Sequence, residues 1–259
     1  MAGRDASVDV VFAQFLAGRR LPEVQHAVRL MGGALQLEDE FDPSTSQRTF
    51  RLTMSDYAIA VVHEPLVRLV EAEAPGVSLR IGHLGPESRS SDRVLLDNDA
   101  LIAPLGFGFP GISRPLWRDR MVVIADRTNP RLADGRLTMA DLAELPHAVG
   151  SFGPGVLTPV DRVFGEHDIE RHVALQVFGF LPLPFVIEGT DMVAVVPEML
   201  ARIHLRPGGA VVLVEPPFGE VLLPEGYWFA QDRLSDPAHR WLFSRLDAVR
   251  DQLASTVAN

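Results

Sequence analysis

Two polar turns in this sequence combine residue types that could hold a small molecule. Residues 55–57 (Ser-Asp-Tyr) follow a strand-like segment at 48–54, and residues 189–191 (Gly-Thr-Asp) follow the apolar stretch 183–187. An apolar run comes after each turn and predicts a helix, at 56–74 and at 192–203. Free backbone N–H groups at a helix start favour negative charge on a ligand. The two turns therefore predict an α/β cleft.

Two further predicted strand ends supply candidate contacts. Residues 104–105 (Pro-Leu) end one predicted strand and residues 151–152 (Ser-Phe) end another, so both should face the crevice at the strand ends. Packing within a loop is the alternative for both pairs. Phe180 lies in an apolar stretch rich in proline, where most rings belong to the core but one could line a pocket. Asp56 and Asp191 are better explained as helix N-caps than as ligand contacts.

The remaining motifs do not predict catalysis. Residues 106–111 fit the dinucleotide pattern G-x-G-x-x-G, but Pro110 and Pro115 oppose the helix that must begin there. The eight histidines contain no pair at the spacing of a zinc helix, and the chain has no cysteine, P-loop or G-x-S-x-G elbow. We therefore expect no catalytic residue, no metal and no cofactor.

Composition bounds the class of protein. The 259 residues are 47% hydrophobic and 22% charged, which is ordinary for a soluble globular chain with one large core or two smaller ones. The formal net charge of −10 argues against a broad basic surface for nucleic acid. No stretch reaches the roughly 18 apolar residues of a membrane span, and no segment has the pattern of a signal peptide. We expect a cytoplasmic protein without a membrane partner.

The elements that must position these residues alternate between strand and helix. This alternation predicts parallel sheets in two similar lobes, with the chain crossing between them near 126–130 and near 216–224. Asp236 and Pro237 open a terminal helix on which His239 and Arg240 should face solvent. Strands are predicted at 50–54, 77–81, 100–103, 121–125, 148–149, 173–177, 185–187, 211–214 and 226–229, with further helices at 21–37, 87–96 and 137–142.

Several segments, taken in order, resemble a known family. Residues 41–57, followed by an apolar helix that leads into 73–81, closely resemble the effector-binding domain of LysR-type transcriptional regulators. Within that family the resemblance is strongest to the NodD-like branch. The other matching segments are 116–119 with 129–130, 137–147, 189–197 and 236–241.

The resemblance implies a fold and a function. It implies a type II periplasmic-binding-protein-like domain with two lobes and two chain crossovers, which binds a small effector between the lobes and pairs as a homodimer. It also implies ligand contact at Ser55, and Thr190 is a similar case. Together with the strand-end residues, the candidate effector contacts are Ser55, Asp56, Tyr57, Pro104, Leu105, Ser151, Phe152, Phe180 and Thr190.

The resemblance also suggests domain limits. Residues 1–40 would be an N-terminal remnant with a linker helix, and residues 46–259 the effector-binding domain, with lobe I at about 46–126 and 222–259 and lobe II at about 127–221. Family members carry a winged helix-turn-helix before the linker helix, and about forty residues are too few to hold it. We therefore expect the DNA-binding head to be missing or truncated, with DNA reached only through a segment of another chain or partner.

Two alternatives stay open at this point. A solute-binding protein of transport shares the two-lobed fold, and an enzyme could be built on the same scaffold because a fold does not determine a function. For the effector, helix starts favour a carboxylic acid and the phenylalanines favour an aromatic body. The expected function is effector sensing in a LysR-type transcriptional regulator, without enzymatic activity.

Overall fold

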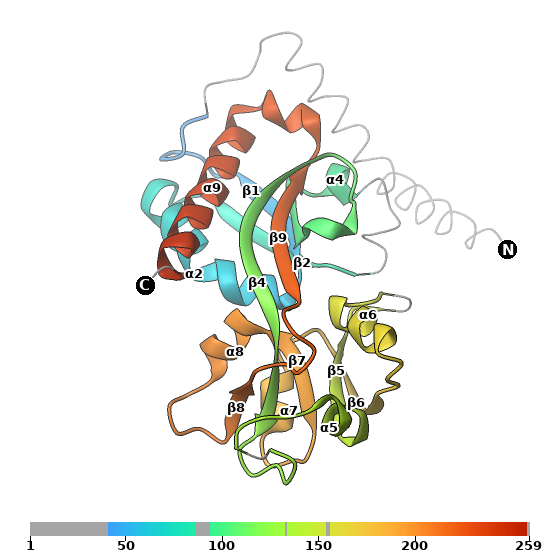
Figure 1. The fold of residues 1–259 in the computed structure, drawn as a ribbon. Coiled ribbons are helices and arrows are strands. Elements are labelled where there is room, and N and C mark those ends of the chain that lie inside the picture. Colours follow the sequence, from blue (N-terminus) through green and yellow to red (C-terminus); the bar gives the residue numbers. More distant parts are fainter. Residues whose placement is uncertain (1–40, 86–93, 133, 154–155, 258–259) are drawn as a thin grey trace, which may run out of the picture.

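The chain forms two lobes that are joined by a pair of adjacent strands (Figure 1). The computed structural model describes residues 41–85, 94–132, 134–153 and 156–257, so the predicted linker helix lies outside the described residues. Hydrogen-bonded strands follow the order β2-β1-β3-β9-β4-β7-β5-β6, and β8 pairs with β4. The strand path therefore passes from one lobe into the other without a break.

Lobe I is an α/β layer around three parallel strands. Alternation places Phe50, Leu52 and Met54 of the first strand on a fully buried face. Neighbouring strands pair with it in parallel on both sides, and an antiparallel strand follows at the inner edge. The elements are β1 (Thr49–Met54), α2 (Asp56–Glu73), β2 (Ser78–His83), α4 (Val94–Asp97), β3 (Ala100–Pro104), η1 (Leu105–Phe107), β9 (Leu222–Phe229), η2 (Gln231–Leu234) and α9 (Pro237–Val257).

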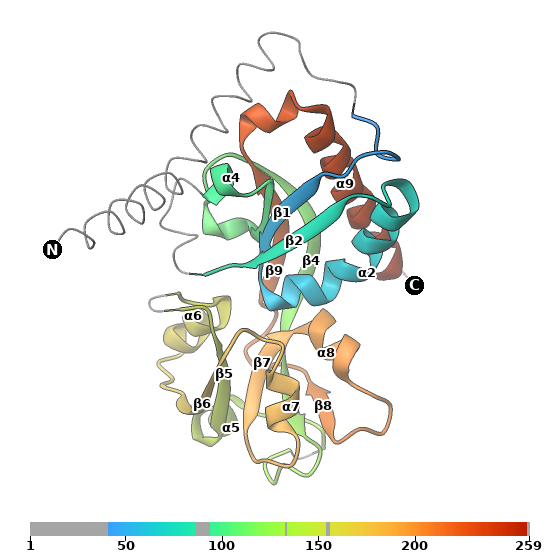
Figure 2. The same ribbon diagram turned by 180° about the vertical axis from the view of Figure 1, so that it is seen from behind.

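Lobe II repeats this plan on a smaller scale. Its central strand β5 pairs in parallel with β6 and β7, and β7 and β8 both pair antiparallel with the end of β4. Seen from behind, its short helices lie on both sides of these strands (Figure 2). The elements are α5 (Met139–Glu144), β5 (Pro146–Ser151), α6 (Pro159–Glu166), β6 (His172–Phe178), α7 (Leu183–Ile187), β7 (Val193–Pro197), α8 (Glu198–His204) and β8 (Val211–Val214).

One long strand, β4 (Ile112–Asp126), serves both lobes. Its residues up to Arg120 pair with β9 in lobe I, whereas those from Met121 onward pair with β7 and β8 in lobe II. The first crossing therefore lies near residue 120, and the prediction of a crossing near 126–130 was wrong. No turn residue marks the place where the strand leaves lobe I, because β4 runs on through the charged residues at 118–120 into Met121–Ala125, which are as buried as the strands of lobe I.

Two predicted elements of lobe II were also wrong. Residues 185–187 were expected as a strand, but they belong to helix α7, which starts beside Pro182 and Pro184 where proline suits a first turn. Residues 192–203 were expected as one helix, but they form strand β7 and then helix α8, with Pro197 between them. A short, fully buried apolar run has the same hydrophobicity in either state, so periodicity alone cannot distinguish them.

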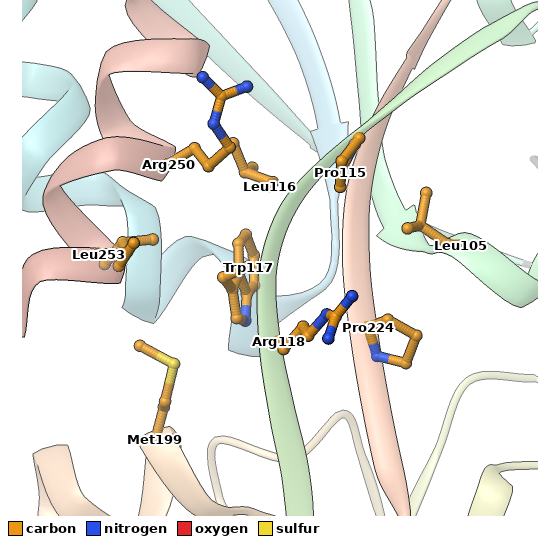
Figure 3. A pocket seen from close by; sticks show the side chains of 10 residues that line it. Leu105, Pro115, Leu116, Trp117, Arg118, Met199, Pro224, Arg250 and Leu253 are labelled. Atoms are coloured by element: carbon orange, nitrogen blue, oxygen red, sulfur yellow. The ribbon is translucent and has the colours of Figure 1, made fainter. Parts of the chain in front are cut away.

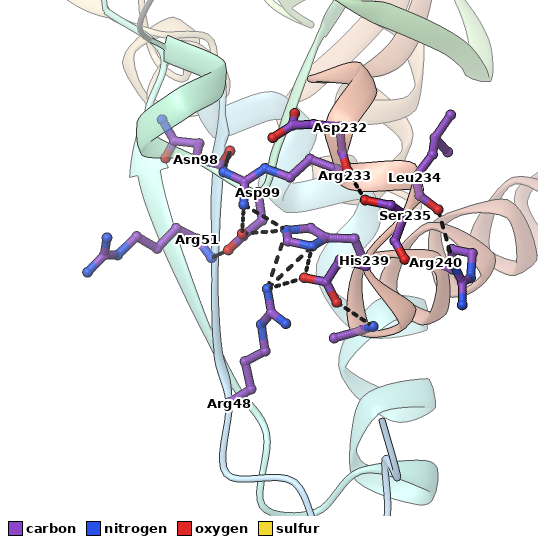
Figure 4. Close-up of polar contacts among 12 residues, drawn as sticks. Arg48, Arg51, Asn98, Asp99, Asp232, Arg233, Leu234, Ser235, His239 and Arg240 are labelled. Atoms are coloured by element: carbon purple, nitrogen blue, oxygen red, sulfur yellow. Dashed lines mark hydrogen bonds and ion pairs between the residues drawn. The ribbon is translucent and has the colours of Figure 1, made fainter. Parts of the chain in front are cut away.

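A buried polar network secures the start of α9 in lobe I (Figure 4). His239 is fully buried, which overturns the expectation that it faces solvent. Its Nε2 lies 2.8 Å from Asp99 Oδ1, its Nδ1 contacts Asp236, and Arg48 donates to Asp236 Oδ2 at 2.9 Å. Buried charges persist when they are paired and hydrogen-bonded, as these are. The network fixes α9 against β1 and the residues before β3.

Candidate functional site

A cavity lies between the two lobes, at the strand ends that the sequence indicated. Five of the nine predicted contact residues line it: Ser55, Tyr57, Pro104, Phe152 and Phe180. The first three come from lobe I and the two phenylalanines from lobe II, so both lobes contribute to its wall. The residues that complete the wall are Leu84, Phe107, Val156, Leu157, Thr158, Pro159, Leu223 and Glu225.

The cavity is small in this state of the protein. Its volume is about 40 Å³, which is enough for a few water molecules. The ring centroids of Phe152 and Phe180 lie 4.8 Å apart, and the Phe180 ring meets the Tyr57 ring edge-on at 6.4 Å. A ligand larger than a few waters therefore needs these rings to move or the lobes to separate.

Ser55 caps the helix that borders the cavity. It has extended backbone angles, and its Oγ accepts a hydrogen bond from Ala58 N at 3.1 Å, so Ser55 and not Asp56 is the N-cap of α2. Asp56 Oδ1 accepts a hydrogen bond from Tyr57 N at 2.8 Å. These two N–H groups, which would otherwise attract an anion, are already satisfied by side chains of the same turn.

Asp56 also joins the lobes. Its Oδ2 accepts a hydrogen bond from Leu181 N of lobe II at 2.7 Å. Gly179 makes this approach possible, because it has a φ of +73° and a Cβ at that position would lie 2.1 Å from Asp56 Oδ2. The rings of His83 and Phe178, 4.2 Å apart, form a second contact between the lobes. Asp56 is thus placed at the rim as a closing contact.

The ring of Tyr57 lines the cavity, and its hydroxyl contacts strand β4, which crosses between the lobes. The hydroxyl donates to Asp119 Oδ2 at 2.5 Å and accepts from Trp117 Nε1 at 2.8 Å. Met199 N at the start of α8 donates to the same carboxylate oxygen at 3.1 Å. Burial raises the pKa of Asp119 and that of the Tyr57 phenol. This cluster connects α2, the crossing strand and lobe II.

Glu225 lines the cavity, and sequence reasoning missed it. It is 2% exposed, and its Oε2 has no hydrogen-bond partner among the described residues. Burial, with a smaller effect from the charge of Asp119, raises its pKa to about 8. A signal was present in the sequence, since Glu225 is the one acidic residue within the apolar run 221–229.

Three predicted residues lie away from the cavity. Leu105 lines a different hollow of about 390 Å³, between β4, α8 and the end of α9, with Trp117, Met199 and Leu253 (Figure 3). Ser151 Oγ accepts a hydrogen bond from Gly153 N at 3.4 Å within its own turn.

Thr190 lies at the end of lobe II that is far from the hinge, the place near residues 120 and 222 where β4 and β9 cross between the lobes. Its hydroxyl donates to Ile187 O at 2.9 Å, and the strand that follows it runs toward the hinge, with Val193 beside Ala125 and Pro197 beside Met121. The turn at 189–191 precedes a strand, so the helix start that was expected to place Thr190 in the cleft does not exist.

Comparison with known proteins identifies the family. The family model described as the LysR substrate binding domain matches residues 43–251. This chain belongs to that family. Nodulation protein D of Rhizobium leguminosarum bv. trifolii is 28% identical over 225 residues, which cover 85% of this chain and 69% of that protein. The predicted resemblance to the NodD-like branch of LysR-type regulators is confirmed.

Solved structures of transcriptional regulators share the fold. A probable transcriptional regulator from Pseudomonas aeruginosa has a TM-score of 0.74 at 28% identity, covering 90% of this chain and 76% of that chain. The regulatory domain of MexT, a transcriptional activator in the same organism, has a TM-score of 0.65 at 27% identity, covering 79% and 99%. The type II periplasmic-binding-protein-like fold is confirmed.

These relatives determine the function at the level of the family. This chain is an effector-sensing domain of a LysR-type transcriptional regulator, and the alternative of a solute-binding protein of transport is not favoured. Among the solved structures that share the fold is full-length CbnR complexed with its target DNA. Within the described residues, no helix combines the length and apolar character needed to cross a membrane.

Proposed function

We propose that the interlobe cavity is the effector site and that its occupant is a small aromatic molecule. The observation that supports this most is the convergence of both lobes on one cavity whose wall is largely apolar, with Phe152 and Phe180 on one side and Tyr57 on the other. Aromatic rings in such a wall favour an aromatic body by offset or edge-to-face contact. Ser55 and Pro104 complete the proposed contacts.

Of the two effector chemistries that the sequence suggested, the wall favours the aromatic one over the carboxylic acid. The N–H groups of Tyr57 and Ala58 are taken by side chains of their own turn. At the start of α6, Thr158 Oγ1 and Asp161 form a capping box that satisfies that helix start in the same way. The described wall residues include no arginine, lysine or histidine to balance a carboxylate.

We propose that the signal is a change in the angle between the lobes. A ligand can shift such an equilibrium only by the difference between its affinities for the two states. The contacts from Asp56 to Leu181 N and from His83 to Phe178 bridge the lobes beside the cavity. An effector that fills the cavity would compete with them or reinforce them, and thereby change the closed population.

We further propose that the protein works in the cytoplasm as a homodimer, binds its effector without chemical turnover, and reaches DNA through a helix-turn-helix segment outside the domain described here. Membership of the LysR family and the regulator neighbours support this proposal. Sedimentation velocity on the purified chain tests the assembly. We expect a dimer at micromolar concentration, and a strictly monomeric chain would contradict the homodimer.

The site itself is tested by ligand screening with two variants. Monocyclic aromatic compounds that bind should raise the melting temperature of the wild-type chain, because a ligand that binds only the folded state stabilises it. Phe180→Ala should reduce this shift. Leu253→Ala, in the larger hollow behind the hinge, should leave it unchanged. Hits that respond to Leu253→Ala and not to Phe180→Ala would place the site in that hollow instead.

A further inference from the structure

We propose that Glu225 is the polar recognition group of the interlobe cavity, and that the effector is an uncharged molecule whose amide or hydroxyl group pairs with this carboxyl. The inference rests on the proposed function, since it needs the effector to enter this cavity. It extends that function by stating which polar group the ligand must carry and which residue binds that group.

The first observation is an unsatisfied carboxyl. Glu225 is 2% exposed, lines the cavity, and its Oε2 has no partner in the part of the chain that the structure describes. Burying a polar group without a hydrogen bond costs stability, and proteins rarely keep such a group without a use. An otherwise apolar wall with one unpaired polar group is the usual form of a small-molecule site, where that group fixes the orientation of the ligand.

The second observation is the position of Glu225. It lies on crossing strand β9, with its backbone in register with Pro104 on one side and Trp117 on the other. Side chains two residues apart on a strand share a face, and Leu223 also lines the cavity. Glu225 therefore stands at the hinge end of the cavity, where a ligand bonded to it would touch the connection between the lobes.

The third observation is the charge around the cavity. The acidic group that acts on Glu225 is Asp119, whose carboxylate is already engaged by the Tyr57 hydroxyl and Met199 N. The raised pKa of Glu225 agrees with this setting, because burial and a like charge both favour the neutral carboxylic acid. A carboxylate ligand would bring a second negative charge close to Asp119, and no cation lines the described wall to offset it.

A neutral carboxylic acid has one donor and one acceptor side by side. An amide presents the complementary pair, so the acid O–H donates to the amide carbonyl while the acid carbonyl accepts from the amide N–H. A hydroxyl group on the ligand can either accept from the acid O–H or donate to the acid carbonyl. With the polar group at Glu225, an attached ring would extend toward Phe152 and Phe180, the aromatic side of the wall.

Three monocyclic probes test this inference on the full 259-residue chain. Benzamide, benzoate and toluene share a ring and differ in the group that would meet Glu225. Dissociation constants would be measured by NMR titration near pH 6.5, where Glu225 is protonated in the folded protein. We expect benzamide to bind more tightly than toluene and benzoate. In Glu225→Leu, benzamide should weaken about tenfold or more while toluene stays within about twofold.

Two variants separate hydrogen bonding from charge and from general effects. Glu225→Gln keeps an uncharged donor and acceptor and should retain most of the benzamide affinity. Glu220→Gln, an exposed position on the segment leading to β9, should bind all three probes as the wild type does. Tighter binding of benzoate than of benzamide would overturn the inference. So would benzamide binding that responds to Phe180→Ala but not to Glu225→Leu, although the cavity would then remain the effector site. If none of the probes binds, or if their binding ignores Phe180→Ala, the proposed cavity fails as well.

Discussion

At Glu225, burial determines the charge of a side chain that would be ionised on the surface at neutral pH. The folded protein holds its pKa near 8, against an ordinary value of 4.5. Between these two values the folded state binds a proton that the unfolded state has released. Its neighbour Asp119 also has a raised pKa, for the same main reason, so the hinge end of the cavity is a place where pH and stability are coupled.

The first prediction is a stability loss at high pH that depends on Glu225. The contribution of Glu225 to the free energy of unfolding is fully present below about pH 4.5 and is lost as pH rises through about 8. The loss should be on the order of a few kcal/mol. Urea unfolding at pH 5 to 9 measures it. Glu225→Gln should flatten this decline and Glu220→Gln should not; an identical decline in all three proteins would contradict the assignment.

The second prediction concerns Tyr57. Tyr57→Phe removes a hydroxyl that both donates to Asp119 and accepts from Trp117, leaving two buried groups short of a partner. We expect a loss of about 1–3 kcal/mol in the free energy of unfolding. Tyr227→Phe is the matched control, because its partners Arg114 and Asp247 also pair with each other at 3.0 Å. Tyr227→Phe should lose less free energy of unfolding than Tyr57→Phe. Equal losses would show that the hydrogen bonds of the Asp119 cluster contribute no more to stability than those of Tyr227.

At this scale the sequence predicted part of the cavity wall. The ends of β1, β3 and β5 were foreseen, so Ser55, Pro104 and Phe152 were placed in the cavity wall. Glu225 was missed because nothing in a single sequence states that a lone acid in an apolar strand has no partner. The role of Asp56 was missed because its contact with Leu181 joins residues 125 positions apart, a distance over which local pattern has no information.

At the scale of elements, lobe closure depends on the turn after β6 meeting the start of α2. Gly179 in this turn has a φ of +73° and faces the Asp56 carboxylate, while Gly189 has the same φ with open space around it. The two glycines therefore allow a matched comparison. A substitution at either one strains the backbone, but only Gly179 lies at the contact between the lobes.

The third prediction uses this pair. Both Gly179→Ala and Gly189→Ala place an L side chain in the left-handed region, at a cost of about 1 kcal/mol. Only Gly179→Ala also drives a methyl group into Asp56. We expect it to lose more stability or to open the lobes, seen as a larger radius of gyration in X-ray scattering. If the two variants behave alike, the lobes do not meet at this turn in solution.

Element types were predictable where alternation or capping was clear. The strand at 50–54 and the helix at 137–142 were confirmed, the latter as α5 with Thr138 as its N-cap. Residues 183–203 were not predictable, because helix α7 and strand β7 are both short and apolar and the boundaries of the elements depend on prolines rather than on periodicity. The misplacement of Thr190 follows directly from that error.

At the scale of the whole molecule, two crossing strands connect the lobes while side-chain contacts at the rim hold them together. The strands β4 and β9 pair with each other through the crossing, from Ile112–Phe229 to Arg120–Leu222. The side-chain contacts between the lobes include Asp56 with Leu181, His83 with Phe178 and Tyr57 with Phe180. Closure is thus the part of the structure that a ligand or a single substitution can shift.

The fourth prediction is that Asp56→Ala shifts the lobes toward a more open arrangement. The chain contains no cysteine, so a pair introduced as Ala72→Cys on α2 and Glu166→Cys on α6 can carry a donor and an acceptor dye without background labelling. Single-molecule energy transfer should show a longer mean separation with Asp56→Ala than without it. Glu71→Ala, on an exposed part of α2, should have no effect. Unchanged transfer in the Asp56 variant would remove Asp56 as a closing contact.

The general architecture was accessible from sequence, and the place of the hinge was not. The order of strands and helices sufficed to predict two lobes with two crossovers. The sequence does not mark the crossing, because β4 stays extended from one lobe into the other, with no turn residue at Arg118, Asp119 or Arg120.

This uninterrupted strand limits how the domain can move. β4 has no loop at the crossing about which the lobes could rotate. Any reorientation of the lobes must therefore be spread as small twists over many residues. The backbone amides of these residues stay hydrogen-bonded, including Met121 N to Val221 O at 2.8 Å. Deuterium uptake should therefore stay slow along Asp119–Met121 whichever arrangement dominates. The amide of Leu181, whose acceptor belongs to the other lobe, would be the one to exchange each time the two halves part.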